Sequence, residues 1–528
     1  MKTLKLEVII SSIIALIFGG LSFFTERFFR NGEPQQIFTY YSSKVLLVIF
    51  VFFVALFLWR FVSRYRNKEN RFYRLWGKYL LYFMIPYLLF LIVVWPGIFI
   101  WDEFWVYECA TKFMLDNWQS YLSVYHYLIS LYIFPSMGSI VLLQVLFMSF
   151  VSSWVFTKIQ TEFEVETRWK WVYWCFYAVY MLSPAITIYV YVTFRSSPLA
   201  ILELWLSGLL FFSLKETKIS NGTLCLIAFL TLILSVWRQE GIYHLVVVPL
   251  FLLVFVRSLN KRKIIYFSMA LVIGYLVTVP LYSTLANQKS ISLRYQLTTY
   301  MNPLSNILVN KDAKIEASSL EVIDKVIDIE KVKASAYIYE VPSYWNGGVR
   351  DGFTQTQFND FKKEFWRIVL DNKDIYLATR VQTMLAASGL SMKGYLPSDS
   401  VTSFFNDKQG AAEMVAVALQ RELNQPIHLS LRTISNHFLE FSLEHRAVLW
   451  NFIPLVLLLL LIFIRKAHIY SPLSWVLALL LLRLPILFVF EPGSYYMYYY
   501  PMIPAGAFFI LIYVLQLAVR DRGIIQRT

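Results

Sequence analysis

Long apolar runs alternate with short charged segments along most of the 528 residues. A spanning helix needs about 17–25 mostly apolar residues, because backbone polar groups in lipid must be paired within the segment. Twelve runs meet this description closely: Val8–Phe24, Val45–Phe61, Tyr79–Trp95, Ser139–Phe156, Trp171–Tyr191, Pro198–Leu214, Thr223–Trp237, Ile242–Val256, Ile264–Leu281, Val448–Ile464, Pro472–Phe490 and Pro501–Val519. The pattern predicts an all-α polytopic membrane protein with about 12 transmembrane helices, juxtamembrane helices and a mainly helical extracytoplasmic domain.

Basic residues predict the orientation, since Lys and Arg collect in cytoplasmic loops. They alternate from loop to loop if there are twelve spans, and the basic loop Arg60–Lys78 is the clearest example. Both termini are then cytoplasmic in a multi-pass cell-membrane protein. Segment 282–446 holds 18 basic and 18 acidic residues, so the whole net charge of +14 lies elsewhere. This excess orients the chain and meets anionic membrane lipids, and it gives no reason to expect nucleic acid.

Four regions follow from these assignments. Residues 1–78 form two extra N-terminal helices and the basic loop, and residues 79–281 form a membrane core whose first outer loop is 96–138. Residues 282–446 form the extracytoplasmic domain, and residues 447–528 form the last helices and a short tail. Within 282–446, apolar stripes predict amphipathic helices. One stripe is Leu320, Val322, Ile323, Val326 and Ile327, and the other is Phe358, Phe361, Phe365, Ile368 and Val369.

The amino-acid composition narrows the class of protein further. Hydrophobic residues make up 58% and charged residues 16% of the chain, against roughly 25% charged in soluble proteins. This excludes an ordinary soluble enzyme. The three cysteines suggest neither a disulfide framework nor a metal cluster.

Ionisable residues gather at one predicted membrane face. A span ends at Pro96-Gly97 and delivers Asp102 and Glu103 to the outer surface, at the start of an amphipathic segment. Further turns on the same face carry Arg195, Arg238 with Glu240, and Glu491. Because charges at membrane depth are costly, these residues are functional candidates.

The chemistry that such a set serves is transfer from a lipid-linked phosphate. Asp102 could accept the proton of an attacking hydroxyl, with Glu103 as a second candidate. Arg195 and Arg238 could hold the phosphate through their planar donor forks. Trp101 and the run Tyr495–Tyr500 could stack on a sugar or form an aromatic belt at the headgroups. Glu240, His126 and Glu491 are candidate substrate contacts.

These residues resemble the first outer loop of GT-C-type membrane glycosyltransferases, in the protein O-mannosyltransferase-like and aminoarabinose-transferase-like branches. The likeness rests on a span ending in Pro-Gly, an acidic residue opening the loop, two juxtamembrane helices and the Tyr125-His126 element. Arg238-Gln239-Glu240-Gly241 is similar to an Arg-x-Glu-Gly element of such proteins. The outer segment resembles that of a poorly characterised bacterial subgroup with two extra N-terminal spans.

The resemblance implies an inverting transfer from a polyprenyl-phosphate sugar donor to an envelope glycan, lipid or protein on the outer face. Asp102 would be the catalytic carboxylate, and a divalent metal remains possible as a cofactor. The sequence departs from many relatives in following His126 with Tyr127 rather than proline.

Other functions stay open. A flippase of lipid-linked saccharide would carry charges along the interiors of several spans, where the main exceptions to apolar composition are Glu203 and Arg483. A scaffold would use the outer domain to capture a partner. A membrane acyltransferase would need a buried histidine inside a span, and the sequence predicts none.

Overall fold

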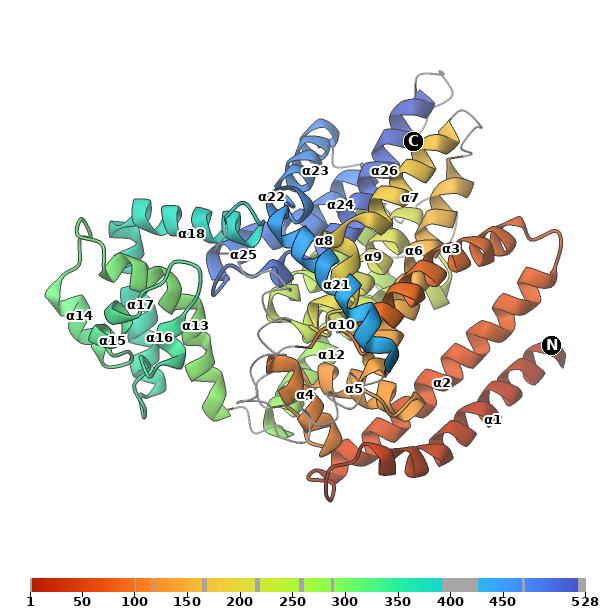
Figure 1. The fold of residues 1–528 in the computed structure, drawn as a ribbon, viewed down its shortest axis with the longest axis horizontal. Coiled ribbons are helices and arrows are strands. Elements are labelled where there is room, and N and C mark those ends of the chain that lie inside the picture. Colours follow the sequence, from red (N-terminus) through yellow and green to blue (C-terminus); the bar gives the residue numbers. More distant parts are fainter. Residues whose placement is uncertain are drawn as a thin grey trace.

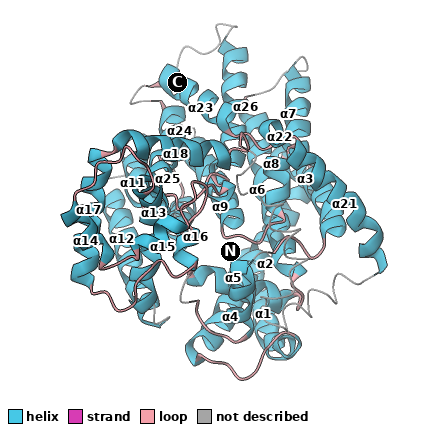
Figure 2. Ribbon diagram, turned by 60° about the vertical axis from the view of Figure 1, so that its left-hand side comes forward, coloured by secondary structure: helices cyan, strands magenta, loops and turns pink. Residues whose placement is uncertain are grey.

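The computed structural model describes residues 2–99, 101–116, 119–163, 169–213, 219–255, 261–285, 289–391, 426–467 and 471–520. Across these residues the regular elements are helices, and the only extended pairings are two isolated backbone bridges (Figure 2). The chain is an all-α protein, as the apolar pattern predicts.

The helices before the outer segment are α1 (Lys2–Thr25), η1 (Glu26–Phe28), α2 (Ile37–Arg66), α3 (Arg71–Val94), α4 (Trp101–Thr111), α5 (Tyr121–Ile133), α6 (Gly138–Glu162), α7 (Lys170–Leu182), α8 (Pro184–Val190), α9 (Ser196–Ser213), α10 (Asn221–Trp237), η3 (Gln239–Gly241), α11 (His244–Phe255) and α12 (Lys261–Leu285). The remaining helices are α13 (Lys289–Leu308), α14 (Ala317–Asp324), α15 (Ile329–Ala334), α16 (Pro342–Trp345), α17 (Gln355–Asp371), α18 (Lys373–Ala387), α21 (Pro426–Glu444), α22 (Arg446–Leu449), α23 (Ile453–Lys466), α24 (Pro472–Leu481), α25 (Arg483–Phe490), η4 (Tyr496–Tyr498) and α26 (Met502–Arg520).

Eight helical segments of the described chain are long and apolar enough to cross a membrane. A bent pair, α7 with α8, makes up to nine, and three shorter apolar helices follow the predicted runs Thr223–Trp237, Ile242–Val256 and Pro501–Val519. Within the described residues, every predicted run therefore falls mainly on helix. The chain has the helices of a membrane protein, and the count of twelve spans stays a prediction.

The predicted run Trp171–Tyr191 is not one straight helix. α7 and α8 meet at an angle of 57°. The break falls at Pro184, which has no backbone N–H to continue the hydrogen-bond ladder and opens α8 instead. The chain just after α8 pairs with the first outer loop, through the bridge between Val192 and Ile98.

The outer segment has a hydrophobic core of its own. The stripe from Phe358 to Val369 is confirmed as a buried face of α17, since Phe358, Phe361 and Phe365 are at most 2% exposed. The stripe from Leu320 to Ile327 is helical only in part, because α14 ends at Asp324, and Val326 and Ile327 are buried in the turn and bridge that follow. α17 begins at a capping box formed by Thr354 and Gln357, which satisfies two backbone groups at the helix start. In Figure 1 the helices α13–α17 lie to the left of the main helical bundle.

Several hydrogen bonds join this outer unit to the membrane helices. Buried Arg380 on α18 donates hydrogen bonds to the carbonyl oxygens of Glu491 (2.5 Å) and Thr299 (3.3 Å). The Ser494 amide donates to the Tyr339 carbonyl at 2.8 Å. The turn after α25 is therefore held against the outer unit.

α1 and α2 pack along each other as an antiparallel pair, drawn in red at the right of Figure 1. α1, η1, α2 and the connection Phe29–Gln36 are together called the N-terminal hairpin below. Its helices contact the rest of the chain mainly through α3 and α5.

Candidate functional site

A short backbone bridge brings the first outer loop to the turn before α9. The Ile98 amide donates to the Tyr191 carbonyl at 2.8 Å, and the Thr193 amide donates to the Ile98 carbonyl at 3.1 Å. Gly97 makes this approach possible, because it has a φ of +115° and a Cβ there would lie 3.0 Å from the Tyr191 oxygen. The bridge sets the start of α4 beside the turn that carries Arg195.

The two predicted acids occupy the first turn of α4 in different surroundings. Asp102 is half-buried, and burial raises its pKa to about 6, while the positive charge of Arg195 lowers it and Asp116 raises it. Glu103 is 1% exposed, and its Oε2 has no hydrogen-bond partner. Burial and the neighbouring Asp102 raise the pKa of Glu103 well above its usual value. With a pKa of about 6, Asp102 is ionised at neutral pH and can accept a proton.

Arg238 follows α10 and is only 3% exposed. Its Nε lies 2.5 Å from Glu240 Oε1, and its guanidinium lies over the Tyr498 ring at 4.5 Å. Nε is thus paired with Glu240, but Nη1 of Arg238 has no hydrogen-bond partner. Such a buried cation with a donor to spare is prepared for an anion.

Two further arginines complete this region. Arg483 at the start of α25 is 1% exposed, lies 3.9 Å from Glu240 and donates to the Tyr498 carbonyl at 3.3 Å. Arg195 is half-buried, and the charges of Asp102 and Glu240 act on it. We call Arg195, Arg238, Arg483, Glu240 and Tyr498 the arginine cluster. The charges of Arg195 and Arg238 also act on Glu103, so the acids of α4 lie beside this cluster.

Hydrogen bonds from α5 hold two of the turns in place. The Trp237 indole donates to Ser123 at 3.0 Å, next to Arg238, and the Tyr127 hydroxyl donates to the Thr193 carbonyl at 3.2 Å, two residues before Arg195. Gly241 allows the turn after Arg238 to fold back tightly, since a Cβ would lie 2.1 Å from the Leu234 oxygen.

Several predicted contacts lie outside the arginine cluster. His126 packs its ring against Trp237 at 6.0 Å, and burial alone lowers its pKa to about 4. Tyr125 shares a hydrogen bond of 2.7 Å with Ser42 of α2. The Tyr495 hydroxyl donates to Glu340 at 3.2 Å. The side chain of Trp101 lies outside the described residues.

The interfacial belt predicted for Tyr495–Tyr500 is wrong for most of this run. Tyr496, Tyr499 and Tyr500 are at most 1% exposed. The hydroxyls of Tyr496 and Tyr500 donate to the carbonyls of Ala185 and Ile186 in α8, at 2.8 and 3.0 Å. These hydrogen bonds hold the segment between α25 and α26 against α8.

Glu491, a predicted substrate contact, is buried and already partnered. It accepts a hydrogen bond from the Tyr499 hydroxyl and one from the Tyr495 amide at 3.4 Å. Burial raises its pKa to about 8, against the lowering effects of Tyr499 and Arg380. Its contacts are those of a structural acid between the last helices and the outer unit.

Sequence reasoning missed a buried histidine. His244 opens α11 with no exposed surface, so the expectation that no histidine lies buried among the spans is wrong. Its Nδ1 donates to the Gly241 carbonyl at 2.8 Å, and its Nε2 lies 3.0 Å from a carboxylate oxygen of Glu203. Glu203 on α9 thus gives the His244 ring a polar partner, which makes its burial possible.

Arg483 was also missed as a member of the site, and Tyr498 was predicted only as part of the run Tyr495–Tyr500. An arginine at the middle of an apolar run was the available signal for Arg483. Tyr498 could not be separated from its tyrosine neighbours by pattern alone.

Among the described residues no group of three or more His, Cys, Asp or Glu side chains is arranged to hold a metal ion. No protein-family model matches the chain, and no curated protein or solved structure is significantly similar to it. Its function is therefore argued from the site itself.

Proposed function

We propose that the chain is a membrane glycosyltransferase that moves a sugar from a polyprenyl-phosphate donor to an acceptor on the outer face. One observation carries the proposal. Buried Arg238 keeps its Nη1 donor without a partner, while its Nε is paired with Glu240. The acids at the start of α4 lie nearby, since the charge of Arg238 acts on Glu103 and that of Arg195 acts on Asp102. A phosphate would satisfy the free donor, and a carboxylate beside it would serve the attacking alcohol.

The proposed step is a single inverting displacement. The oxygen of an acceptor hydroxyl forms a bond to the anomeric carbon, and the bond from that carbon to the phosphate oxygen breaks. Asp102 takes the hydroxyl proton, and the carrier phosphate leaves with the bonding electron pair. Arg195 and Arg238 stabilise the charge that grows on this phosphate, since preorganised cations in a water-poor site act strongly.

The alternative explanation for these arginines is snorkelling, in which a long side chain reaches from a span end to the headgroups. That explanation requires an exposed guanidinium. Arg238 and Arg483 are 3% and 1% exposed and lie against Tyr498 and Glu240. Their burial favours a role inside the protein.

Binding of the carrier tests the proposal directly. Arg238→Ala in the full chain, reconstituted in nanodiscs, should weaken binding of a polyprenyl phosphate about 10- to 100-fold, because charge-assisted hydrogen bonds contribute roughly 1.5–3 kcal/mol. Arg367→Ala is the matched control, since Arg367 pairs with Glu316 and Glu364 on the outer unit. Equal carrier affinity in wild type and Arg238→Ala would remove Arg238 from the site.

The second candidate function is a flippase of lipid-linked saccharide. The buried pair of Glu203 and His244 favours it, because paired ionisable groups within a membrane bundle often line a pathway. Proteoliposomes containing a polyprenyl-phosphate sugar separate the two functions. A transferase changes the donor covalently and releases carrier phosphate, whereas a flippase moves intact donor between leaflets.

A further inference from the structure

The connection between α1 and α2 is hydrogen-bonded along the end of α4. The amides of Asn31 and Gln35 donate to the carbonyls of Thr111 and Lys112, both at 2.9 Å. The amide of Gln36 donates to the carbonyl of Phe113 at 3.2 Å. Three consecutive carbonyls of the first outer loop are thus bound by the N-terminal hairpin.

Gln36 is the centre of this contact. Its side-chain oxygen accepts from the Leu115 amide at 3.0 Å and from the Thr39 hydroxyl at 2.9 Å. Its side-chain nitrogen donates to the Leu285 carbonyl at 3.3 Å, at the end of α12. One side chain therefore ties the hairpin both to the first outer loop and to a distant helix.

The backbone of Phe113 is strained, which indicates that neighbouring residues hold the first outer loop in this conformation. It has a φ of +52°, a left-handed conformation that bulky residues rarely adopt. Its side chain is fully buried, and its amide donates to the Ala110 carbonyl at 3.1 Å. Such a conformation persists only when the surroundings impose it, and the Gln36 amide bound to its carbonyl is one of the contacts that impose it.

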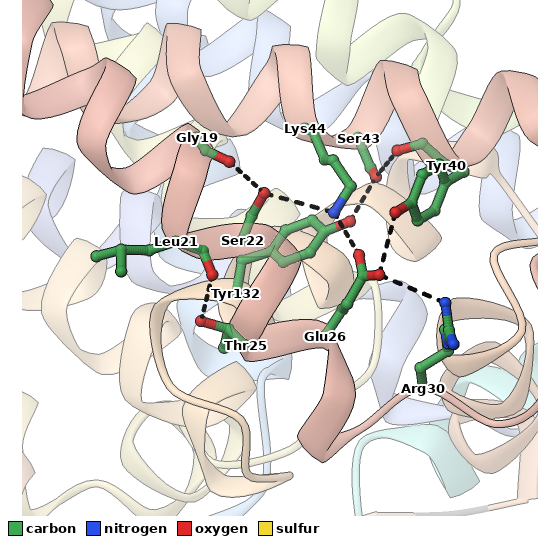
Figure 3. Close-up of polar contacts among 10 residues, drawn as sticks. All are labelled: Gly19, Leu21, Ser22, Thr25, Glu26, Arg30, Tyr40, Ser43, Lys44 and Tyr132. Carbon is green, nitrogen blue, oxygen red and sulfur yellow. Dashed lines mark hydrogen bonds and ion pairs between the residues drawn. The ribbon is translucent and has the colours of Figure 1, made fainter.

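A buried ion pair joins the two arms of the hairpin on either side of this connection. Lys44 of α2 contacts Glu26 of η1, with side chains 6% and 5% exposed (Figure 3). Glu26 also accepts from the Tyr40 hydroxyl at 3.0 Å and from Arg30 at 3.5 Å. The Lys44 ammonium lies 4.9 Å from the ring centre of Tyr132 on α5. We call these five residues the lysine cluster.

The restrained loop leads to an acid next to the candidate site. The Trp105 indole donates to Asp116 Oδ1 at 3.1 Å, and the Tyr282 hydroxyl donates to the Asp116 carbonyl. The charge of Asp116 acts on both Asp102 and Glu103. A shift of the loop would therefore move a charge beside the two acids and loosen the end of their helix.

We propose that the N-terminal hairpin is a positioning element, in which Gln36 and the lysine cluster hold the first outer loop so that α4 presents its acids to the arginine cluster. The catalytic part of this inference rests on the proposed function, whereas the restraint on the loop does not. The two extra helices then serve the site directly, although they contribute no residue to the chemistry.

Cys109 reports on the restraint without any sugar chemistry. It lies on α4 with no exposed surface, and the other two cysteines, Cys175 and Cys225, are exposed. In a Cys175→Ala, Cys225→Ala background in nanodiscs, a membrane-impermeant maleimide should label Cys109 at least tenfold faster when Lys44→Met is added. Gln36→Ala, which leaves the ion pair intact, should raise the rate several-fold.

Arg60→Gln is the matched control. Arg60 pairs with Glu7 at 3.2 Å between the same two helices, in the half of α2 remote from the Gln36 contact. It should leave the labelling rate unchanged. Thermal unfolding and gel filtration identify any variant that has lost its fold, and Gln36→Ala then decides the outcome. Unchanged protection of Cys109 in both Lys44→Met and Gln36→Ala would overturn the proposed restraint.

The catalytic part has a separate readout. With a polyprenyl-phosphate sugar as donor, Gln36→Ala should lower the rate of transfer while leaving affinity for the carrier phosphate close to wild type. Faster labelling with an unchanged transfer rate would overturn the positioning role. If the wild-type chain transfers no sugar at all, the proposed function fails, and the labelling result still decides whether the hairpin restrains the loop.

Discussion

The lysine cluster and the arginine cluster bury charge in opposite ways. In the first, Lys44, Glu26, Tyr40 and Arg30 form a closed set, and each polar group finds a partner in the protein. In the second, Arg238 is equally buried and pairs its Nε with Glu240, but it keeps Nη1 without a partner, and Glu103 keeps an unpartnered carboxylate oxygen. Buried polar groups are normally satisfied, so an unsatisfied set calls for a ligand.

The difference teaches that burial of charge alone does not mark a site. Both clusters lie toward the ends of membrane helices, and both contain a close ion pair. What separates them is the balance of donors and acceptors. Substitutions in the lysine cluster, whose polar groups are paired with one another, should change the stability of the fold. Substitutions in the arginine cluster, which keeps an unpaired donor, should change ligand binding and the reaction rate.

The largest effect is expected for the acids beside the arginine cluster, and it is an effect on turnover. Asp102→Asn should lower sugar transfer by about 10²–10⁴-fold, the usual contribution of a positioned general base. Carrier binding and thermal stability should stay near wild type, because Asp102 is half-buried and the amide keeps its shape. Donor turnover measured with a polyprenyl-phosphate sugar checks this. Wild-type turnover would exclude Asp102 as the base.

The closed cluster should respond in stability instead. Lys44→Met leaves Glu26 buried without its strongest partner, and breaking such a pair costs about 3–5 kcal/mol. The double variant Glu26→Leu, Lys44→Met removes both charges and should recover most of that loss. Thermal unfolding of the purified chain measures both. If the double variant is no more stable than Lys44→Met, the pair does not act as a closed unit.

The smallest effect is a shift in pH dependence. The rate of transfer should rise with pH as Asp102 ionises, with a midpoint near its pKa of about 6. Asp116 raises that pKa, so Asp116→Asn should move the midpoint to lower pH, by less than about one unit at the distances of charges that do not touch. A pH–rate profile of the two proteins tests this, and a shift toward higher pH would contradict it.

Much of the fold could be predicted because the helices are long and apolar. Every apolar run is mainly helix where the structure describes it, and the stripe from Phe358 to Val369 is a buried face. The bend at Pro184 could not be predicted reliably, since Pro86 lies inside the continuous helix α3. Whether a proline breaks a helix depends on what its neighbours contact.

The candidate site was predicted only in outline. Charge at membrane depth pointed to Arg195, Arg238 and Glu240, but local pattern could not place Tyr125 or His126, whose partners come from α2 and α10. Arg483 stood out as a charge within a span, but its contact with Glu240 depends on how distant helices pack. The glycosyl-transfer assignment itself remains a prediction.

The bridge between Ile98 and Val192 fixes the backbone just before α4, so the number of residues between Ile98 and Asp102 matters. It anchors the backbone four residues before Asp102, and each residue added to a helix turns its side chains by about 100°. Inserting one residue at the start of α4 should therefore swing both acids away from Arg195, whereas an insertion in an exposed turn such as that at Gly352 should be absorbed. Spacing, as much as residue identity, is what this part of the molecule has to preserve.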